Sequence, residues 1–144
     1  MHHNLQRFLE AQNQNYLKAL AEISHGMKTT HWMWYIFPQI QGLGQSETAR
    51  FFGITDLDEA AAYLQHPVLG KHLVQISTEL LKHKELSAAE IFGHPDDMKL
   101  KSSMTLFTNV PDSHKVFRQV LDTFFNGEQD EKTLQILDNH HQPS

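Results

Sequence analysis

Residues 31–39 read His-Trp-Met-Trp-Tyr-Ile-Phe-Pro-Gln, and they include both tryptophans of this 144-residue chain. Aromatic side chains bury more surface than other residues, and those of Trp and Tyr also carry a polar group that needs a partner. Pro38 ends the segment, because proline cannot continue the interior of a helix. So dense an aromatic segment indicates either the centre of a small hydrophobic core or the wall of a binding pocket.

The composition of the chain fits one globular domain in the cytoplasm. Hydrophobic residues make up 40% and charged residues 20%, which is ordinary for a folded domain of this length. The chain has no cysteine, so packing alone must stabilise it. The longest apolar run, residues 32–37, is too short to cross a bilayer, and no secretory signal is visible. The net charge of −5 argues against general nucleic-acid binding, which needs clustered Lys and Arg.

Helix signals run along the whole sequence. Apolar residues recur at three- and four-residue intervals within residues 5–20, 68–81, 100–107 and 116–125, the pattern of one apolar helical face. No comparable run alternates with a period of two, so we predict an all-α fold of about eight short helices. The expected helix starts and ends are Ser46, Asp56, Ser87 and Pro95, and Gly26, Gly53, Gly93 and Gly127.

Residues 96–107 are predicted to form a helix with two different faces. Leu100, Met104 and Phe107 form a core face, whereas Lys99 and Ser103 share another face. Serine and threonine are mediocre helix formers. Their presence here indicates either close packing between helices or a surface that recognises an anionic or polyhydroxyl ligand. Ser102 and Thr105 flank this second face. On the packing alternative, Asp97 and Lys101 form an ordinary surface ion pair.

The aromatic segment offers a candidate for proton transfer. His31 and Trp34 are three residues apart, so both face the same way if the segment is helical, and Gln39 follows the proline. Histidine can exchange protons near neutral pH, and an aromatic wall suits a flat ligand ring. Burial in the core is the alternative role for this histidine.

Residues 41–46, Gln-Gly-Leu-Gly-Gln-Ser, form a loop before a helix. The loop lacks the third glycine and the preceding strand of a dinucleotide fingerprint. It either caps the helix or binds an anion there with help from Arg50. Among the eleven histidines, the pair His66 and His72 is six residues apart, which puts the two on nearly opposite helix faces. We therefore expect no metal site and no cofactor.

Four segments together resemble the DUF1810 family, a bacterial family of uncharacterised, mainly α-helical domains. The segments are residues 31–39, the Gly42/Gly44 loop, His-Pro-Val-Leu-Gly at 66–70, and Asp-Met-Lys-Leu-Lys-Ser-Ser-Met-Thr-Leu-Phe at 97–107. The resemblance runs from about Leu5 to Leu137 and implies one helical domain, which we place at residues 1–138 with a frayed tail at 139–144. Because no activity is established for the family, no catalytic residue is transferred.

Two hypotheses of function follow from the sequence. The first is a site for a phosphorylated or nucleotide-like small molecule, with His31 as the general acid or base. The second is a non-catalytic domain that docks to a partner protein or to itself, and the sequence leaves its oligomeric state open. The first hypothesis requires two groups of residues to converge on one cleft: His31, Trp34 and Gln39 on one side, and Lys99, Ser102, Ser103 and Thr105 on the other. In a reaction, Lys99 or Lys101 would hold the anion.

Overall fold

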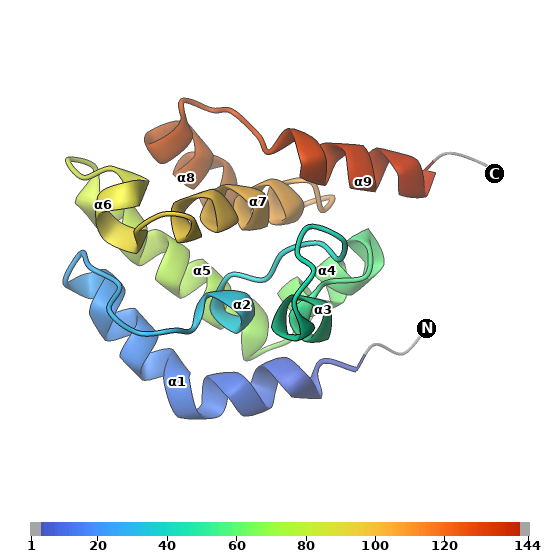
Figure 1. Ribbon diagram of the computed structural model, residues 1–144, viewed down its shortest axis with the longest axis horizontal. Helices are drawn as coiled ribbons and strands as arrows, with labels where there is room; N and C mark the ends of the chain where they lie inside the picture. The colour runs from blue at the N-terminus through green and yellow to red at the C-terminus, as the bar shows by residue number, and fades with distance from the viewer. Residues whose placement is uncertain (1–3, 142–144) are drawn as a thin grey trace.

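Helix α7 (Asp96–Thr108) runs through the middle of the molecule, and other helices pack around it (Figure 1). The computed structural model describes residues 4–141, and the side chains of residues 4–140. This part of the chain contains nine α-helices, one 3-10 helix and no strand, so the predicted all-α fold is confirmed. The other elements are α1 (Gln6–Ser24), α2 (Met33–Ile36), α3 (Glu47–Phe52), α4 (Leu57–Gln65), α5 (Leu69–Leu80), η1 (Leu81–His83), α6 (Ala88–Phe92), α8 (Val116–Phe125) and α9 (Glu131–His141).

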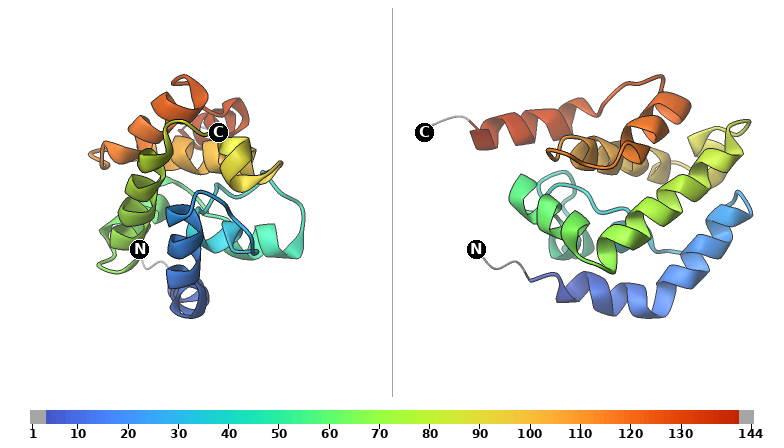
Figure 2. Two further views of the ribbon diagram at one scale, coloured as in Figure 1. Left: turned by 90° about the vertical axis from the view of Figure 1, so that its left-hand side faces the viewer. Right: turned by 180° about the vertical axis from the view of Figure 1, so that it is seen from behind.

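The helices lie on two sides of α7. Helices α8 and α9 cover one side, and α1 to α4 lie on the other (Figure 1). Helix α5 crosses between the two groups and packs against both α1 and α8, as the turned views show (Figure 2). No helix within residues 4–141 is long and apolar enough to cross a membrane.

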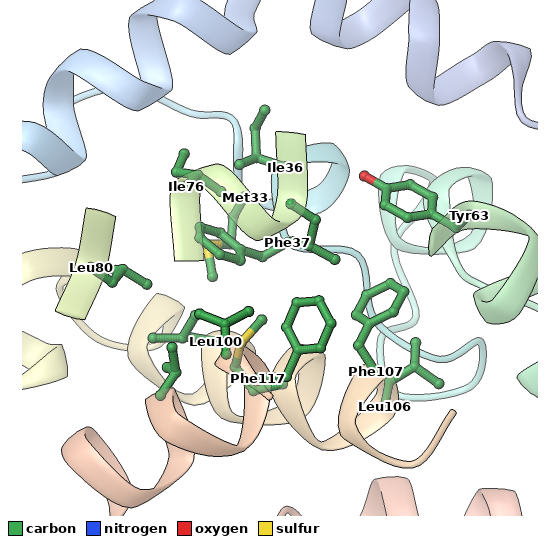
Figure 3. Close-up of a cluster of buried hydrophobic side chains, with 14 of the residues drawn as sticks. Met33, Ile36, Phe37, Tyr63, Ile76, Leu80, Leu100, Leu106, Phe107 and Phe117 are labelled. Atoms are coloured by element: carbon green, nitrogen blue, oxygen red, sulfur yellow. The ribbon is translucent and has the colours of Figure 1, made fainter. Parts of the chain in front are cut away.

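The core forms where the aromatic segment meets α5, α7 and α8. Side chains from all four converge there, including Phe37, Phe107 and Phe117, which are fully buried (Figure 3). Trp32 is buried as well, whereas the rings of Trp34 and Tyr35 are only half-buried. Most of the aromatic segment therefore belongs to the core, and Trp34 lies at its margin.

Helix caps account for several of the predicted boundaries. The Ser46 hydroxyl accepts a hydrogen bond from the backbone N–H of Ala49, and Asp56 caps α4 in the same way. Ser87 and Glu90 form the reciprocal capping box that their spacing predicts. Each cap satisfies an N–H that the first turn of a helix leaves unpaired.

One local expectation, the frayed tail, differs from the structure. Helix α1 is continuous through residues 13–15, although it bends along its length (Figure 2). There the side chain of Asn15 donates to the carbonyl of Ala11 instead of ending the helix. Helix α9 extends to His141, so residues 139–141 of the expected tail are helical. Residues 142–144 lie outside the described residues.

A buried carboxylate holds the aromatic segment against α1. Glu22 accepts hydrogen bonds from the backbone N–H groups of Thr29 and Thr30, the Thr30 hydroxyl, and Nε1 of Trp32 at 2.9 Å. Burial opposes the ionisation of Glu22, but these hydrogen bonds outweigh it and lower the pKa from 4.5 to about 2. The tryptophan N–H thus finds the partner that its burial requires.

Residues 66–70 bring α4 and α5 into close contact. The Nδ1 atom of His66 accepts from the N–H groups of Val68 and Leu69, which caps the start of α5. A Cβ atom on Gly70 would lie 2.0 Å from the carbonyl oxygen of Leu64. Only glycine therefore allows the two helices to approach this closely.

Candidate functional site

Two of the predicted site residues, Trp34 and Lys99, are in direct contact. The Nζ atom of Lys99 lies 4.3 Å from the centroid of the Trp34 ring and 3.2 Å from the carboxylate of Asp96. Asp96 also pairs with Lys28 at 2.8 Å. Burial disfavours the Asp96 carboxylate, but hydrogen bonds from both lysines outweigh it and lower its pKa. The charge of Lys99 is therefore balanced within the protein.

Gln39 shares a small hollow with Trp34. Its side chain is 7% exposed, and within the described residues its Nε2 atom has no hydrogen-bond partner. The hollow is also lined by Gly44 and Gly53 and has a volume of about 10 Å³, enough for about one water molecule. We refer to Trp34, Gln39, Asp96 and Lys99 as the Trp34–Lys99 region. The hollow beside Trp34 and Gln39 is therefore too small for an organic ligand.

The hydroxyl residues of α7 are packed inside the protein. Ser102 donates to the carbonyl of Met98, and Thr105 donates to the carbonyl of Lys101. The Thr105 hydroxyl also accepts from the backbone N–H of Asp130, which connects α7 to the start of α9. These contacts match the packing alternative, and a ligand role for Ser102 and Thr105 stays a prediction.

Ser103 is fully buried, and its hydroxyl has no partner among the described residues. Its neighbour Lys101 pairs with Glu128 at 3.5 Å and lies over the ring of Phe125. The surface pair between Lys101 and Asp97 that the spacing suggested does not form, because Asp97 contacts His94 instead. The role of Ser103 and Lys101 in ligand binding is still untested.

His31 and Arg50 are exposed and stand apart from these contacts. Helix α2 begins at Met33, so His31 precedes the helix and does not share a helical face with Trp34. Arg50 lies in the last turn of α3, where its backbone carbonyl accepts from the Gln41 side chain. Among the described residues, no hydrogen bond, ion pair or ring contact joins either side chain to Lys99, and both roles remain predictions.

A much larger hollow lies between α4, α5 and the segment that leads into α8. Its volume is about 680 Å³, within the range of small-molecule sites. We call it the α5 cleft. It has an apolar floor and a polar rim, formed by Ala61, Leu64, Gly70, Val74, Val110, Pro111 and Phe117, and by Gln65, Lys71, Gln75, Asp112, Ser113 and His114.

The polar rim presents groups that are free to bind. The Lys71 ammonium has no ion-pair or hydrogen-bond partner in residues 4–141. The Nδ1 atom of His114 accepts from the N–H of Val116 at 3.0 Å, so the proton of the neutral ring is on Nε2 and can be donated. Asp112 adds a carboxylate to the same rim. The cleft can therefore bind an anionic group at Lys71 and a hydrogen-bond donor at Asp112.

The sequence gives little warning of this cleft. Lys71, Asp112 and His114 are exposed residues of ordinary surface types. The one signal is the His-Pro-Val-Leu-Gly motif at 66–70, whose glycine forms part of the cleft wall. In the sequence, that motif indicates the family resemblance but not a cleft.

A family model described as a protein of unknown function, DUF1810, matches residues 2–137. The chain belongs to the DUF1810 family. A crystal structure of the conserved hypothetical protein Rv1873 from Mycobacterium tuberculosis is 42% identical and superposes with a TM-score of 0.92. The match covers 94% of this chain and 96% of that protein. Comparison with curated proteins gives no match.

Within residues 4–140, five large hydrophobic residues are exposed, and they bear on the alternative of protein docking. Leu17 and Val68 line one groove between α1 and α5. Met27 follows α1, Phe51 lies in α3, and Met98 lies in α7. Phe51 is the sole aromatic among them, and self-association stays a prediction.

Proposed function

We propose that this DUF1810 domain binds a small organic anion in the α5 cleft. One observation carries the proposal: an open hollow of about 680 Å³ has an apolar floor and an unpaired ammonium group on its rim. An apolar body would contact Val74 and Val110, and the anionic group would pair with Lys71. A phosphorylated or nucleotide-like molecule, the ligand class that the sequence suggested, has both parts.

The balance of charges favours the cleft over the Trp34–Lys99 region. A ligand anion at Lys99 would compete with Asp96 at 3.2 Å and with the face of Trp34. An anion at Lys71 would displace no internal partner among the described residues. Because each internal contact would have to be lost on binding, the free ammonium is the better anion partner.

A thermal-shift screen against nucleotides, sugar phosphates and organic acids tests the proposal. A ligand that binds only the folded state raises the melting temperature by mass action. We expect the shift to be lost in Lys71→Gln and kept in Lys99→Gln. Lys132→Gln, an exposed lysine of α9, is the matched control and should behave as the wild type.

A substitution of His114 tests a second group on the polar rim of the α5 cleft. His114→Asn keeps a side chain that can cap α8 but removes the Nε2 donor. It should weaken binding without lowering the melting temperature of the free protein. A hit that is lost in Lys99→Gln but kept in Lys71→Gln would move the ligand to the Trp34–Lys99 region and contradict the proposal.

A further inference from the structure

A second hollow lies between α1 and α5. Its volume is about 610 Å³, and its lining includes Gln12, Tyr16 and Leu17 of α1 and Val68, His72 and Gln75 from the start of α5 onward. We call it the α1–α5 groove. It adjoins the α5 cleft, since Lys71 and Gln75 line both. A ligand site here depends on which ring nitrogen of His72 carries the proton, and Gln12 determines this.

The Gln12 side chain has a single possible orientation. Its amide nitrogen lies 2.8 Å from the backbone carbonyl of Tyr35 and 2.8 Å from the hydroxyl of Tyr63. A backbone carbonyl can only accept a hydrogen bond, so the atom facing it must be the NH₂ group. The carbonyl oxygen of Gln12 therefore faces His72.

This orientation decides which ring nitrogen of His72 carries the proton. The Nδ1 atom of His72 lies 2.8 Å from Oε1 of Gln12. That oxygen can only accept, so Nδ1 must donate. In the neutral ring, Nε2 then keeps its lone pair, and within residues 4–141 it has no hydrogen-bond partner.

The surroundings hold the ring in place and in its neutral form. The His72 ring stacks on the Tyr16 ring at a centroid separation of 3.6 Å and an angle of 6°. The Tyr16 hydroxyl is itself hydrogen-bonded to Oε1 of Gln75 at 2.6 Å. Burial, and then the charge of Lys71, lower the pKa of His72. Near neutral pH the Nε2 atom of His72 is thus a hydrogen-bond acceptor in a fixed position.

We propose that the α1–α5 groove is a second ligand site, in which Nε2 of His72 accepts a hydrogen bond from an O–H or N–H group of a neutral, partly apolar molecule. The apolar part would contact Leu17 and Val68, which are 78% and 42% exposed. A histidine whose tautomer is set by a second residue is a common arrangement where the free nitrogen contacts a ligand. This site takes a neutral donor, so it does not rest on anion binding in the α5 cleft.

Nitrogen NMR of the full chain with labelled histidine tests the tautomer directly. Near pH 7.5 we expect the His72 signals of a neutral ring protonated on Nδ1, the nitrogen that faces Oε1 of Gln12. Signals of a ring protonated on Nε2 in the wild type would overturn the proposal.

Phenol and anisole then test the binding. Both have an aromatic ring, but only phenol has an O–H group to donate. Phenol should shift the His72 Nε2 resonance and bind about fivefold more tightly than anisole, the ratio that one hydrogen bond gives. His72→Phe keeps a ring for stacking on Tyr16 and should remove that preference. Equal binding of the two probes, or no phenol-dependent shift at His72, would overturn the proposal even if His72→Phe does not fold.

Discussion

The Trp34–Lys99 region and the α5 cleft each contain a lysine ammonium group, which is paired within the protein in the first and unpaired in the second. In the first, Lys99 is held by Asp96 and by the face of Trp34, and the adjoining hollow measures about 10 Å³. In the second, Lys71 has no partner among the described residues and borders a hollow of about 680 Å³. An ammonium group beside an aromatic or apolar wall is thus a structural contact in one place and an available binding group in the other.

Whether a lysine ammonium group has internal partners, and how much open space borders it, therefore matters more for ligand binding than the residue types around it. Removing an internal partner of Lys99 should cost stability, because the contact exists without ligand. Removing the charge of Lys71 should cost binding, because the contact exists only with ligand.

The largest effect is expected for Gly70→Ala, in the wall of the α5 cleft. The added methyl group would lie 2.0 Å from the Leu64 carbonyl, and backbone cannot move aside without separating α4 from α5. We expect a loss of about 3 kcal/mol in the free energy of unfolding, measured by denaturant titration. Thr78→Ala, on the exposed side of the same helix, should change it by less than about 0.5 kcal/mol. Equal effects would show that the cleft wall is not tightly packed.

Glu22→Gln should have the next largest effect on stability, because Glu22 holds the aromatic segment that contains Trp34 against α1. The amide cannot accept all the hydrogen bonds that Glu22 receives from Thr29, Thr30 and Trp32. The expected loss is about 2 kcal/mol, because hydrogen bonds to charged groups are involved. Glu10→Gln, exposed on the same helix, is the control and should stay near the wild type.

The stabilisation by Glu22 should also depend on pH. The folded pKa is lowered to about 2 from 4.5, so the contribution is present above about pH 4.5 and is lost as the pH falls toward 2. The difference in unfolding free energy between wild type and Glu22→Gln should therefore shrink over this range. A difference that stays constant from pH 6 to pH 2.5 would contradict the assignment.

A double-mutant cycle of Lys99→Gln and Trp34→Leu measures the contact that closes the Trp34–Lys99 region. The ammonium lies 4.3 Å from the ring centroid, and such pairs contribute about 0.5–1 kcal/mol. We expect a coupling energy of that size in denaturant titrations. A coupling of zero would mean that the Trp34 ring does not hold Lys99, which would leave Asp96 as its one partner among the described residues.

Lys71→Gln should have the smallest effect on stability. Its ammonium group has no partner among the described residues, so the free energy of unfolding should change by less than about 0.5 kcal/mol. A larger loss would reveal that Lys71 stabilises the fold, and the contrast with Lys99 would fail.

The sequence predicts the fold better than the site, for a physical reason. Caps such as Ser46 and Ser87 and the apolar faces of α7 and α8 depend on local spacing, which the sequence contains. The start of α2 at Met33 follows residues that Glu22 of α1 holds by hydrogen bonds, and these contacts are not a local sequence pattern. Short-range patterns therefore predict helices, whereas their exact ends require the tertiary structure.

The residues that look unusual in the sequence are mostly those that pack tightly. Ser102, Ser103 and Thr105 are mediocre helix formers. Their burial in α7 explains their presence there, because small side chains fit where helices pack closely. The contact between Trp34 and Lys99 joins the two segments that the sequence selected, although it leaves no room between them. Lys71 and His72 look ordinary, since an open cleft and a fixed tautomer arise only from long-range contacts such as that with Gln12.

A backbone amide NMR titration with phenyl phosphate tests the central claim most directly, because the probe combines an apolar ring with an anionic group. We predict saturable shifts at Gly70, Lys71 and residues 110–114, with affinity reduced about fivefold or more in Lys71→Gln and unchanged in Lys132→Gln. Shifts centred on Trp34, Lys99 and residues 41–46, or binding that Lys71→Gln leaves intact, would contradict the account.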